Sequence, residues 1–137
     1  MKIKFSKEWK KSTKARKQRK FRHNAPLHTK QKFMHSHLSK ALKKKYGKRA
    51  VGLRKGDKVK IVRGQYKKKT GKVERIDLKK NLAYVSDIEV IRKDGSKRLI
   101  GIFPSKLIIE ELNLEDKRRV ETIEGKKAGE KPEQKKK

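Results

Sequence analysis

The residues of this chain that point most clearly to a binding chemistry are its closely spaced cations. Lysine and arginine fill more than half of the positions from residue 10 to residue 22, and aromatic rings stand beside them at Trp9 and Phe21. Successive cations neutralise successive phosphates, and an aromatic ring offers a face to an unstacked base. A solvated basic tail or a nuclear-localisation run is the alternative. The predicted phosphate contacts are Lys10, Lys11, Lys14, Arg16, Lys17, Arg19, Lys20 and Arg22.

A second group of cations lies in a short loop between two glycines. Gly64 and Gly71 flank the run QYKKKT, and a strand-like segment stands on each side of it. Because glycine lets the backbone turn without a Cβ clash, this pattern predicts a hairpin whose tip presents lysines. A further lysine face is predicted on a helix near residue 43. The remaining cations that we assign to a nucleic acid are Lys30, Lys32, Lys43, Lys44, Lys97 and Arg98.

Other kinds of site chemistry have little support in the sequence. The four histidines lack cysteines and convergent acids, and their HxH spacing fits neither the i, i+4 helical pair nor a tetrahedral metal set. We find no nucleophile with a base, no paired acids in an apolar setting and no phosphate-binding glycine fingerprint. Turn formation accounts for Asp57, Asp77, Asp87 and Asp94. We therefore predict no metal, no cofactor and no enzymatic activity.

Composition explains why a polyanion is expected. The 137 residues carry 45 lysines and arginines against 15 acids, a net charge of +30. Residues 1–54 contribute +19, residues 55–110 contribute +9 and residues 111–137 contribute +2. Such a field repels itself in free solution and calls for a polyanionic partner. No cysteine, membrane-length apolar run or secretory signal is present, so we expect an intracellular protein.

Two short helices are predicted to connect the basic arm to the rest of the chain. Pro26 interrupts regular structure, and residues 27–34 fit a short helix. Ser36 is placed to cap a second helix that carries Leu38, Leu42 and Tyr46 and ends at Gly47. Its apolar side is expected to pack on protein, and its lysine side to face RNA.

The segment from residue 53 to residue 109 predicts five short strands. Alternation places strands at 58–62, 73–76, 82–91, 97–103 and 105–109, with turns at 78–81 and at the Asp94-Gly95 pair. Five strands in under 60 residues indicate a small, closed or nearly closed antiparallel barrel. Leu82, Tyr84 and Ile88 are expected to share one face. The predicted core is Val59, Ile61, Val73, Ile76, Leu82, Tyr84, Val85, Ile88, Leu99, Ile100, Ile102, Leu107 and Ile109.

The C-terminal part predicts a short helix followed by a disordered tail. Asn113 can cap the helix, Glu115 and Asp116 complement its N-terminus, and Gly125 ends it. The residues after it contain almost no apolar side chain and should be disordered without a partner. The chain thus divides into a basic extended arm (1–25), docking helices (26–52), a barrel (53–110) and a helix with a charged tail (111–137).

The hairpin GDKVKIVRGQYKKKTGKVERID resembles a KOW motif, the strand-loop-strand unit of ribosomal proteins and NusG-type transcription factors. The flanking strings RKFRHNAPLHTKQKFMHSHLSKALKKKYG and GIFPSKLII resemble the archaeal and eukaryotic form of the large-subunit ribosomal protein numbered twenty-four (twenty-six in eukaryotes). The resemblance covers residues 20–114. It implies an SH3-like barrel on the 5′ region of large-subunit rRNA, near the nascent-peptide tunnel exit, with a part in subunit assembly and with neighbouring ribosomal proteins as further partners.

The resemblance also implies which residues meet the RNA. It places Arg22, His23, Asn24 and Pro26 in an RNA-embedded arm and Pro104, Ser105 and Lys106 in a contact at the barrel end. Lysine is a point charge, so such a loop suits recognition of backbone and shape rather than of base edges. The residues that it assigns to the KOW loop are Arg63, Gly64, Lys67, Lys68, Lys69, Thr70, Gly71 and Lys72.

Three other binding functions compete with this interpretation. A KOW-type elongation factor would need a polymerase-binding α/β domain, and residues 1–54 are too short and too basic to form one. A free RNA-binding factor would share the same cations. A membrane-surface protein would need a sustained apolar helix face, which the arm lacks. The sequence therefore predicts a structural protein of the ribosome in the cytoplasm.

Overall fold

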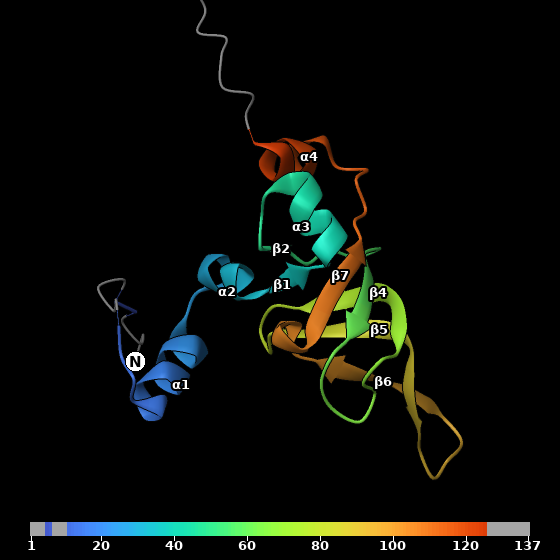
Figure 1. Ribbon diagram of the computed structural model, residues 1–137. Helices are drawn as coiled ribbons and strands as arrows, with labels where there is room; N and C mark the ends of the chain where they lie inside the picture. The colour runs from blue at the N-terminus through green and yellow to red at the C-terminus, as the bar shows by residue number, and fades with distance from the viewer. Residues whose placement is uncertain (1–4, 7–10, 126–137) are drawn as a thin grey trace, which may run out of the picture.

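The computed structural model describes residues 5–6 and 11–125, and a small β structure forms its centre (Figure 1). The five strands predicted between residues 53 and 111 are present as β3 to β7, and two further strands precede them. In chain order the elements are α1 (Ala15–Asn24), α2 (Leu27–Phe33), β1 (His35–Leu38), α3 (Lys40–Tyr46), β2 (Ala50–Gly52), β3 (Lys58–Ile61), β4 (Thr70–Asp77), β5 (Leu82–Ile91), β6 (Lys97–Ile102), the 3-10 turn η1 (Pro104–Lys106), β7 (Leu107–Glu111) and α4 (Lys117–Glu124).

The strands form one mixed, seven-stranded sheet in the order β2-β1-β7-β3-β4-β5-β6. Neighbouring strands are antiparallel except β1 and β7, which pair in parallel through His37 with Ile108 and Leu38 with Ile109. The long strand β4 pairs with β3 on one side and with β5 on the other. The protein is therefore mainly β, with the small SH3-like barrel that we predicted and a two-stranded addition along β7.

The core lies inside this barrel. Eight of the thirteen predicted core residues are buried, and the docking segment adds Met34 and Leu38 to them. Ile76 and Ile100 pack on the core while partly exposed. Because residues before the barrel help to fill its interior, the barrel and its N-terminal addition form one packing unit. The fully formed cluster is Met34, Leu38, Leu53, Val59, Ile61, Val73, Ala83, Val85, Ile88, Ile102, Leu107 and Ile109.

The orientation of β5 differs from the prediction. Ala83 and Val85 are completely buried, whereas Leu82 and Tyr84 lie on the partly exposed outer face. Ile88 is also buried, although it is three residues from Val85, because Asp87 has a φ of 63° and the pairing with β6 shifts there. This β-bulge changes which alternate residues face inward. A strictly alternating pattern cannot show such a change of register.

The segment before α3 is a strand rather than the start of a helix. Ser36 and Leu38 are buried and His35 and His37 exposed, the alternation of a half-buried strand. Ser36 is therefore not the helix cap that we predicted. Ser39 caps α3 instead, since its hydroxyl accepts a hydrogen bond from the Leu42 amide. The predicted end of this helix at Gly47 is confirmed, with a left-handed φ of 63°.

The basic arm is helical where it was expected to be extended. Residues 15–24 form α1, which ends two residues before Pro26. Its alanine, arginines, lysines and glutamine are good helix formers, so the local sequence favours a helix. The ring of Phe21 lies 4.9 Å from that of Phe5 and 6.1 Å from that of Phe33, measured between centroids. This aromatic contact joins α1 to α2, beside the barrel (Figure 1).

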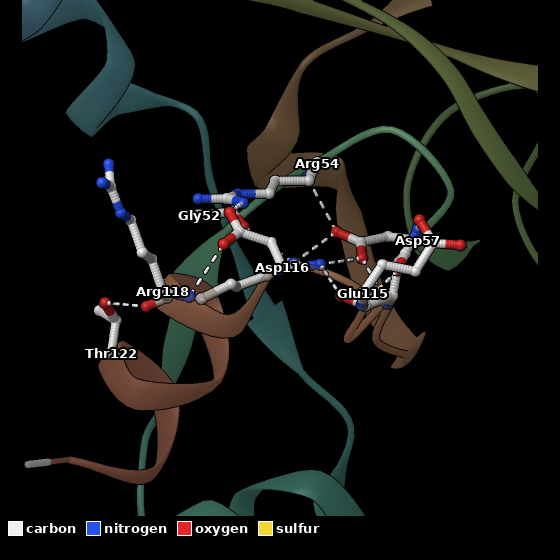
Figure 2. A network of polar contacts seen from close by, with 9 residues as sticks. Gly52, Arg54, Asp57, Glu115, Asp116, Arg118 and Thr122 are labelled. Atoms are coloured by element: carbon white, nitrogen blue, oxygen red, sulfur yellow. Dashed lines mark hydrogen bonds and ion pairs between the residues drawn. The ribbon is translucent and has the colours of Figure 1, made fainter.

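Helix α4 is attached to the barrel by a buried ion pair. Both oxygens of Asp57, which has no exposed surface, accept from the guanidinium of Arg119 at 2.6 and 2.7 Å. The same carboxylate accepts from the backbone amide of Arg54 at 2.8 Å (Figure 2). It also accepts from the backbone amide of Asn113 at 3.0 Å. The sequence assigned Asp57 to a turn only. In the structure, Asp57 also attaches the C-terminal segment to the start of the barrel.

The start of α4 corrects one further prediction. Asp116, not Asn113, caps the helix by accepting from the Arg118 amide at 2.9 Å (Figure 2). Asn113 instead forms a local turn, in which its side chain accepts from the Glu115 amide. Gly125 ends α4 with a φ of 80°, as predicted. The predicted disordered tail lies outside the described residues.

Candidate nucleic-acid interface

The loop between β3 and β4, residues 62–69, is held by its own backbone. The Ile61 amide donates to the Lys69 carbonyl at 2.9 Å, and the Lys68 amide donates to the Ile61 carbonyl at 2.8 Å. A tight turn inside the loop is closed by the Lys67 amide and the Gly64 carbonyl at 3.1 Å. Because the backbone bonds to itself, the lysine side chains are left at the surface, where Lys67, Lys68 and Lys69 are all exposed.

Two residues of this loop have left-handed backbone conformations. Gly64 has a φ of 102°, which a residue without Cβ adopts at no steric cost. Lys68 has a φ of 74°, which strains any residue that carries a Cβ. Such strain, when the surrounding structure maintains it, is often found where a side chain has a functional position. Glycine at position 68 would therefore relieve this backbone strain.

The turn η1 lies directly against this loop. The Val62 amide donates to the Lys106 carbonyl at 2.9 Å, and the Arg63 guanidinium donates to the Ser105 carbonyl at 3.4 Å. The Lys106 ammonium is 4.0 Å from the position that a Cβ on Gly64 would take. Cations about 40 residues apart in the sequence therefore form one surface. We call it the loop-turn surface, and it consists of Arg63, Lys67, Lys68, Lys69 and Lys106.

The position of η1 depends on the strand that the sequence did not predict. Ser36 of β1 is completely buried, and its hydroxyl donates to the Pro104 carbonyl at 3.0 Å. Pro104 is buried too, while Ser105 and Lys106 are exposed beside it. The docking segment and the barrel end are thereby connected through one buried hydrogen bond. This contact places Lys106 next to the KOW-like loop.

The charge of the loop-turn surface is not neutralised within the described part of the chain. In residues 5–6 and 11–125, none of its five cations lies within ion-pair distance of a carboxylate. Lysines on the neighbouring strands differ: Lys58 contacts Glu111 at 2.7 Å and Lys60 lies 3.9 Å from Glu110. The hydrogen bond with Glu111 raises the pKa of Lys58 above its ordinary value. The cations at this end of the barrel are therefore free of acidic partners among the described residues.

The other residues assigned to the KOW loop have different positions. Thr70 and Gly71 belong to β4, where Gly71 pairs with Val59. A Cβ on Gly71 would lie 2.8 Å from both the Ser86 carbonyl oxygen and a Val85 methyl group, so this glycine permits close packing of β4 on β5. Lys72 is exposed on β4. The glycine that makes the turn is Gly64 alone.

Helix α1 carries the second concentration of cations. Its charged side chains are all exposed, and no acid occurs among its ten residues. Phe21 is half-buried against two other aromatic rings, so much of its surface is used in packing rather than offered to a base. His23 contacts Asn24 at 3.1 Å. Lys11 and Lys14 precede the helix and are exposed, whereas Lys10 lies outside the described residues.

The remaining predicted cations do not join these two groups. Lys30 donates to the Lys79 carbonyl at 3.2 Å, which connects α2 with the β4-β5 turn. Lys32 is exposed on α2, and Lys43 and Lys44 lie on α3. Lys97 and Arg98 belong to the β5-β6 hairpin, which projects from the barrel on the side away from α1 (Figure 1). Lys97 lies 3.7 Å from Glu89 and is partly neutralised.

The acidic side chain of Asp94 has a structural partner. The pKa of Asp94 is below its ordinary value because Ser96 donates hydrogen bonds to it, which stabilises the hairpin turn. No group of three or more histidine or acidic residues suited to a metal ion occurs in residues 5–6 and 11–125. No helix in these ranges is long and apolar enough to span a membrane.

Comparison with known proteins identifies the family of this chain. Residues 12–126 match the family described as the eukaryotic L26 ribosomal proteins and their archaeal counterparts, which are numbered twenty-four. The chain is 44% identical over 112 residues to "Large ribosomal subunit protein uL24" of Methanosarcina barkeri, an alignment that covers 82% of this chain and 97% of that protein. The protein of the same name from Methanocorpusculum labreanum is 43% identical over 82% of this chain and 93% of its own.

A third relative extends the comparison. "Large ribosomal subunit protein uL24" of Methanothrix thermoacetophila is 44% identical over 108 residues, covering 79% of this chain and 93% of its own. The matched residues 12–126 include α1, the whole barrel and α4, so the similarity is not limited to the KOW-like hairpin. With a match over most of its length, this chain belongs to the family of eukaryotic L26 ribosomal proteins and their archaeal counterparts numbered twenty-four.

Proposed function

We propose that this protein is a structural constituent of the large ribosomal subunit in the cytoplasm. It binds the 5′ region of large-subunit rRNA, supports assembly of the subunit and lies near the exit of the nascent-peptide tunnel beside other large-subunit proteins. It uses no cofactor and catalyses no reaction. The names of its relatives support the assignment to the large ribosomal subunit. The resemblance described above supports binding to the 5′ region of the rRNA and the position near the tunnel exit.

The observation that carries this proposal is the unopposed charge of the loop-turn surface. Arg63 and Lys106 meet there from two distant segments, and no carboxylate of the described residues pairs with either. Placing cations together without acids costs electrostatic free energy in the free protein, and binding to phosphates recovers it. A surface of this kind fits a partner with regularly spaced negative charges.

The side chains of this surface favour recognition of RNA shape over base sequence. Lysine is a point charge that bonds to a phosphate without a fixed geometry, and the loop contains three in a row. The guanidinium of Arg63 is already used in part by the Ser105 carbonyl. Tyr66 lies beneath the Lys69 ammonium, 5.4 Å from it, so its ring orients a cation as well. We assign phosphate contacts to Lys67, Lys68 and Lys69.

Helix α1 is the second proposed contact. Its exposed cations surround the helix, and a basic helix without acids fits between RNA strands, where phosphates approach it from several sides. The aromatic contact of Phe21 with Phe33 joins this helix to α2. We assign RNA contacts to Lys11, Lys14, Arg16, Lys17, Arg19, Lys20, Arg22, His23 and Asn24, and, outside the described residues, to Lys10.

The lysines of the loop provide the sharpest test of the RNA contact. The variant with Lys67, Lys68 and Lys69 replaced by alanine should lose about 2 to 3 units from the slope of log affinity against log salt, at about 0.7 to 0.9 per phosphate contact. The measurement is filter binding to a transcript of the 5′ region of large-subunit rRNA between about 50 and 300 mM salt. The matched control replaces Lys58 and Lys60, which contact Glu111 and Glu110, and should change the slope by less than about one unit. Equal slopes for the two variants would show that the loop lysines do not contact the RNA.

Sedimentation tests the assignment to the ribosome. The chain should migrate with the large subunit in a sucrose gradient of cell lysate and should stay there at about 0.5 M salt. A protein embedded through many contacts remains bound under conditions that release a protein held by a few surface phosphate contacts. Migration with RNA polymerase would favour an elongation factor. Migration as free protein at every salt concentration would favour a free RNA-binding factor.

A further inference from the structure

The β5-β6 hairpin carries an apolar groove that the RNA contacts do not use. The groove has a volume of about 410 Å³, and its apolar lining includes Leu82 and Val90 of β5 and Ile100 of β6. Val90 is 46% exposed, and its neighbour Ile91 is 69% exposed. Large aliphatic side chains that remain this exposed at one end of a small protein indicate a binding surface.

The charges around the groove all have one sign. The charged residues that line it are Lys80, Arg92 and Arg98. Within residues 5–6 and 11–125, no carboxylate lies within ion-pair distance of these three cations. Glu89, the nearest acid in sequence to Val90, does not line the groove and lies 3.7 Å from Lys97. A complementary partner therefore brings apolar groups and negative charges together.

The lining fits a protein segment better than a nucleotide. Bases are recognised by stacking on aromatic rings and by hydrogen bonds to their edges. The one aromatic residue that lines this groove, Tyr84, already has the Arg75 guanidinium over its ring, 4.5 Å from the centroid. The other apolar walls are aliphatic, and they match leucine, isoleucine or valine side chains of a partner.

The edge of the sheet offers backbone groups beside the groove. Strand β6 is the end strand of the described sheet and pairs with β5 only. Its other edge can therefore bond to an extended segment, whose alternate side chains would then lie over the groove. The hairpin also projects from the barrel, on the side away from α1 and α2 (Figure 1). A protein partner can thus reach it while RNA occupies the basic end.

We propose that the groove of the β5-β6 hairpin is a docking site for an extended protein segment that presents aliphatic side chains and carboxylates on the same face. The aliphatic side chains fill the groove beside Val90 and Ile100, and the carboxylates pair with Arg92, Arg98 and Lys80. Arg98, assigned to RNA from its charge alone, belongs to this protein contact instead. The site goes beyond the proposed RNA function and does not depend on it.

The probe for this site is a peptide of about 12 residues that repeats leucine-serine-glutamate-serine, so that leucine and glutamate share one face, compared with a peptide in which serine replaces each leucine. Binding of the fluorescent peptides to the full chain is measured by anisotropy at about 150 mM salt, and methyl resonances report where they bind. The leucine peptide should shift the methyl groups of Leu82, Val90 and Ile100. The serine peptide has the same charge and should bind at least about tenfold more weakly, because it buries no apolar surface.

Matched variants separate the groove from general charge attraction. Val90→Ser and Arg98→Glu should each lower the affinity of the chain for the leucine peptide at least about fivefold. Ile91→Ser and Lys93→Glu are the controls, because these neighbours lie on the same hairpin but do not line the groove, and each should change affinity less than about twofold. Arg98→Glu changes no buried side chain, so it tests the site even if Val90→Ser perturbs the hairpin.

Three results would overturn the proposal. The first is equal affinity of the leucine and serine peptides, and the second is an equal loss in Arg98→Glu and Lys93→Glu. The third is that a single-stranded RNA of about 12 nucleotides shifts the methyl groups of Val90 and Ile100 while the leucine peptide leaves them unmoved. In that case the groove belongs to the RNA surface, and the RNA-binding function would stand without the docking site.

Discussion

The buried ion pair between Asp57 and Arg119 should make α4 a determinant of barrel stability. Replacing Arg119 with methionine removes the donors at 2.6 and 2.7 Å and leaves the carboxylate of Asp57, which has no exposed surface, with only the amides of Arg54 and Asn113. Removing one partner of a buried pair costs about 3 to 5 kcal/mol. The total free energy of unfolding of such domains is about 5 to 15 kcal/mol. We therefore expect a loss of about a fifth or more of the stability.

Urea unfolding followed by circular dichroism measures this cost. Arg118→Met is the matched control, because Arg118 is the exposed neighbour of Arg119 on the same helix, and its replacement should change the free energy of unfolding by less than about 0.5 kcal/mol. A double-mutant cycle with Asp57→Asn isolates the pair. Coupling of at least about 2 kcal/mol is expected, since the second replacement removes a charge that has already lost its partner.

Two outcomes would refute this reasoning about the ion pair. If Arg119→Met cost under about 1 kcal/mol, the carboxylate of Asp57 would have to be solvated in the variant, and its burial would not depend on the helix. If the two replacements were additive, the pair would contribute nothing beyond the packing of the two side chains. Either result would make α4 an appendage of the barrel rather than part of it.

Three further predictions concern single positions. Lys68→Gly should stabilise the protein by about 1 kcal/mol in urea unfolding, since it relieves a φ of 74°, while weakening rRNA binding in the filter assay. Gly71→Ala should destabilise it by about 2 kcal/mol, because the new Cβ would lie 2.8 Å from the Ser86 carbonyl oxygen, and unchanged stability would show that β5 can move away. The hydrogen bond from Arg54 lowers the pKa of Asp116 below the ordinary value of 3.8. The stabilisation of α4 by the Asp116 carboxylate should therefore be complete at neutral pH, persist to below pH 3.8 and be lost as the pH falls through the lowered pKa. A titration of Asp116 by NMR with a midpoint at or above 3.8 would contradict the contact with Arg54.

The sequence alone predicted most of the barrel because its signals are local. Alternation from Val59 to Ile61, the turn at Asp94-Gly95 and the helix end at Gly47 depend on neighbouring residues, and each appears where predicted. The concentration of cations in the arm and in the loop is likewise a property of composition. The family resemblance rested on contiguous strings, and the comparison confirmed it.

The predictions failed where a residue depends on a partner far along the chain. His35–Leu38 is a strand because β7 and β2 pair with it, and nothing in the four residues themselves distinguishes them from the start of a helix. The inward face of β5 changes at Asp87, whose left-handed conformation a periodic pattern cannot reveal. The carboxylate of Asp57 had the sequence context of a turn, and its ion pair is 62 residues away.

The candidate site divides in the same way. The sequence determined that this protein carries excess positive charge and which segments hold it, because charge and local turn chemistry are properties of the residues themselves. Only the tertiary structure decided that Lys106 lies beside Arg63 and Gly64, that Phe21 is packed against Phe33, and that the charge at one end of the barrel meets no acid of the described residues. The physical reason is that adjacency across a sheet is set by strand pairing and by buried contacts such as that of Ser36 with Pro104, which involve residues far apart in the chain.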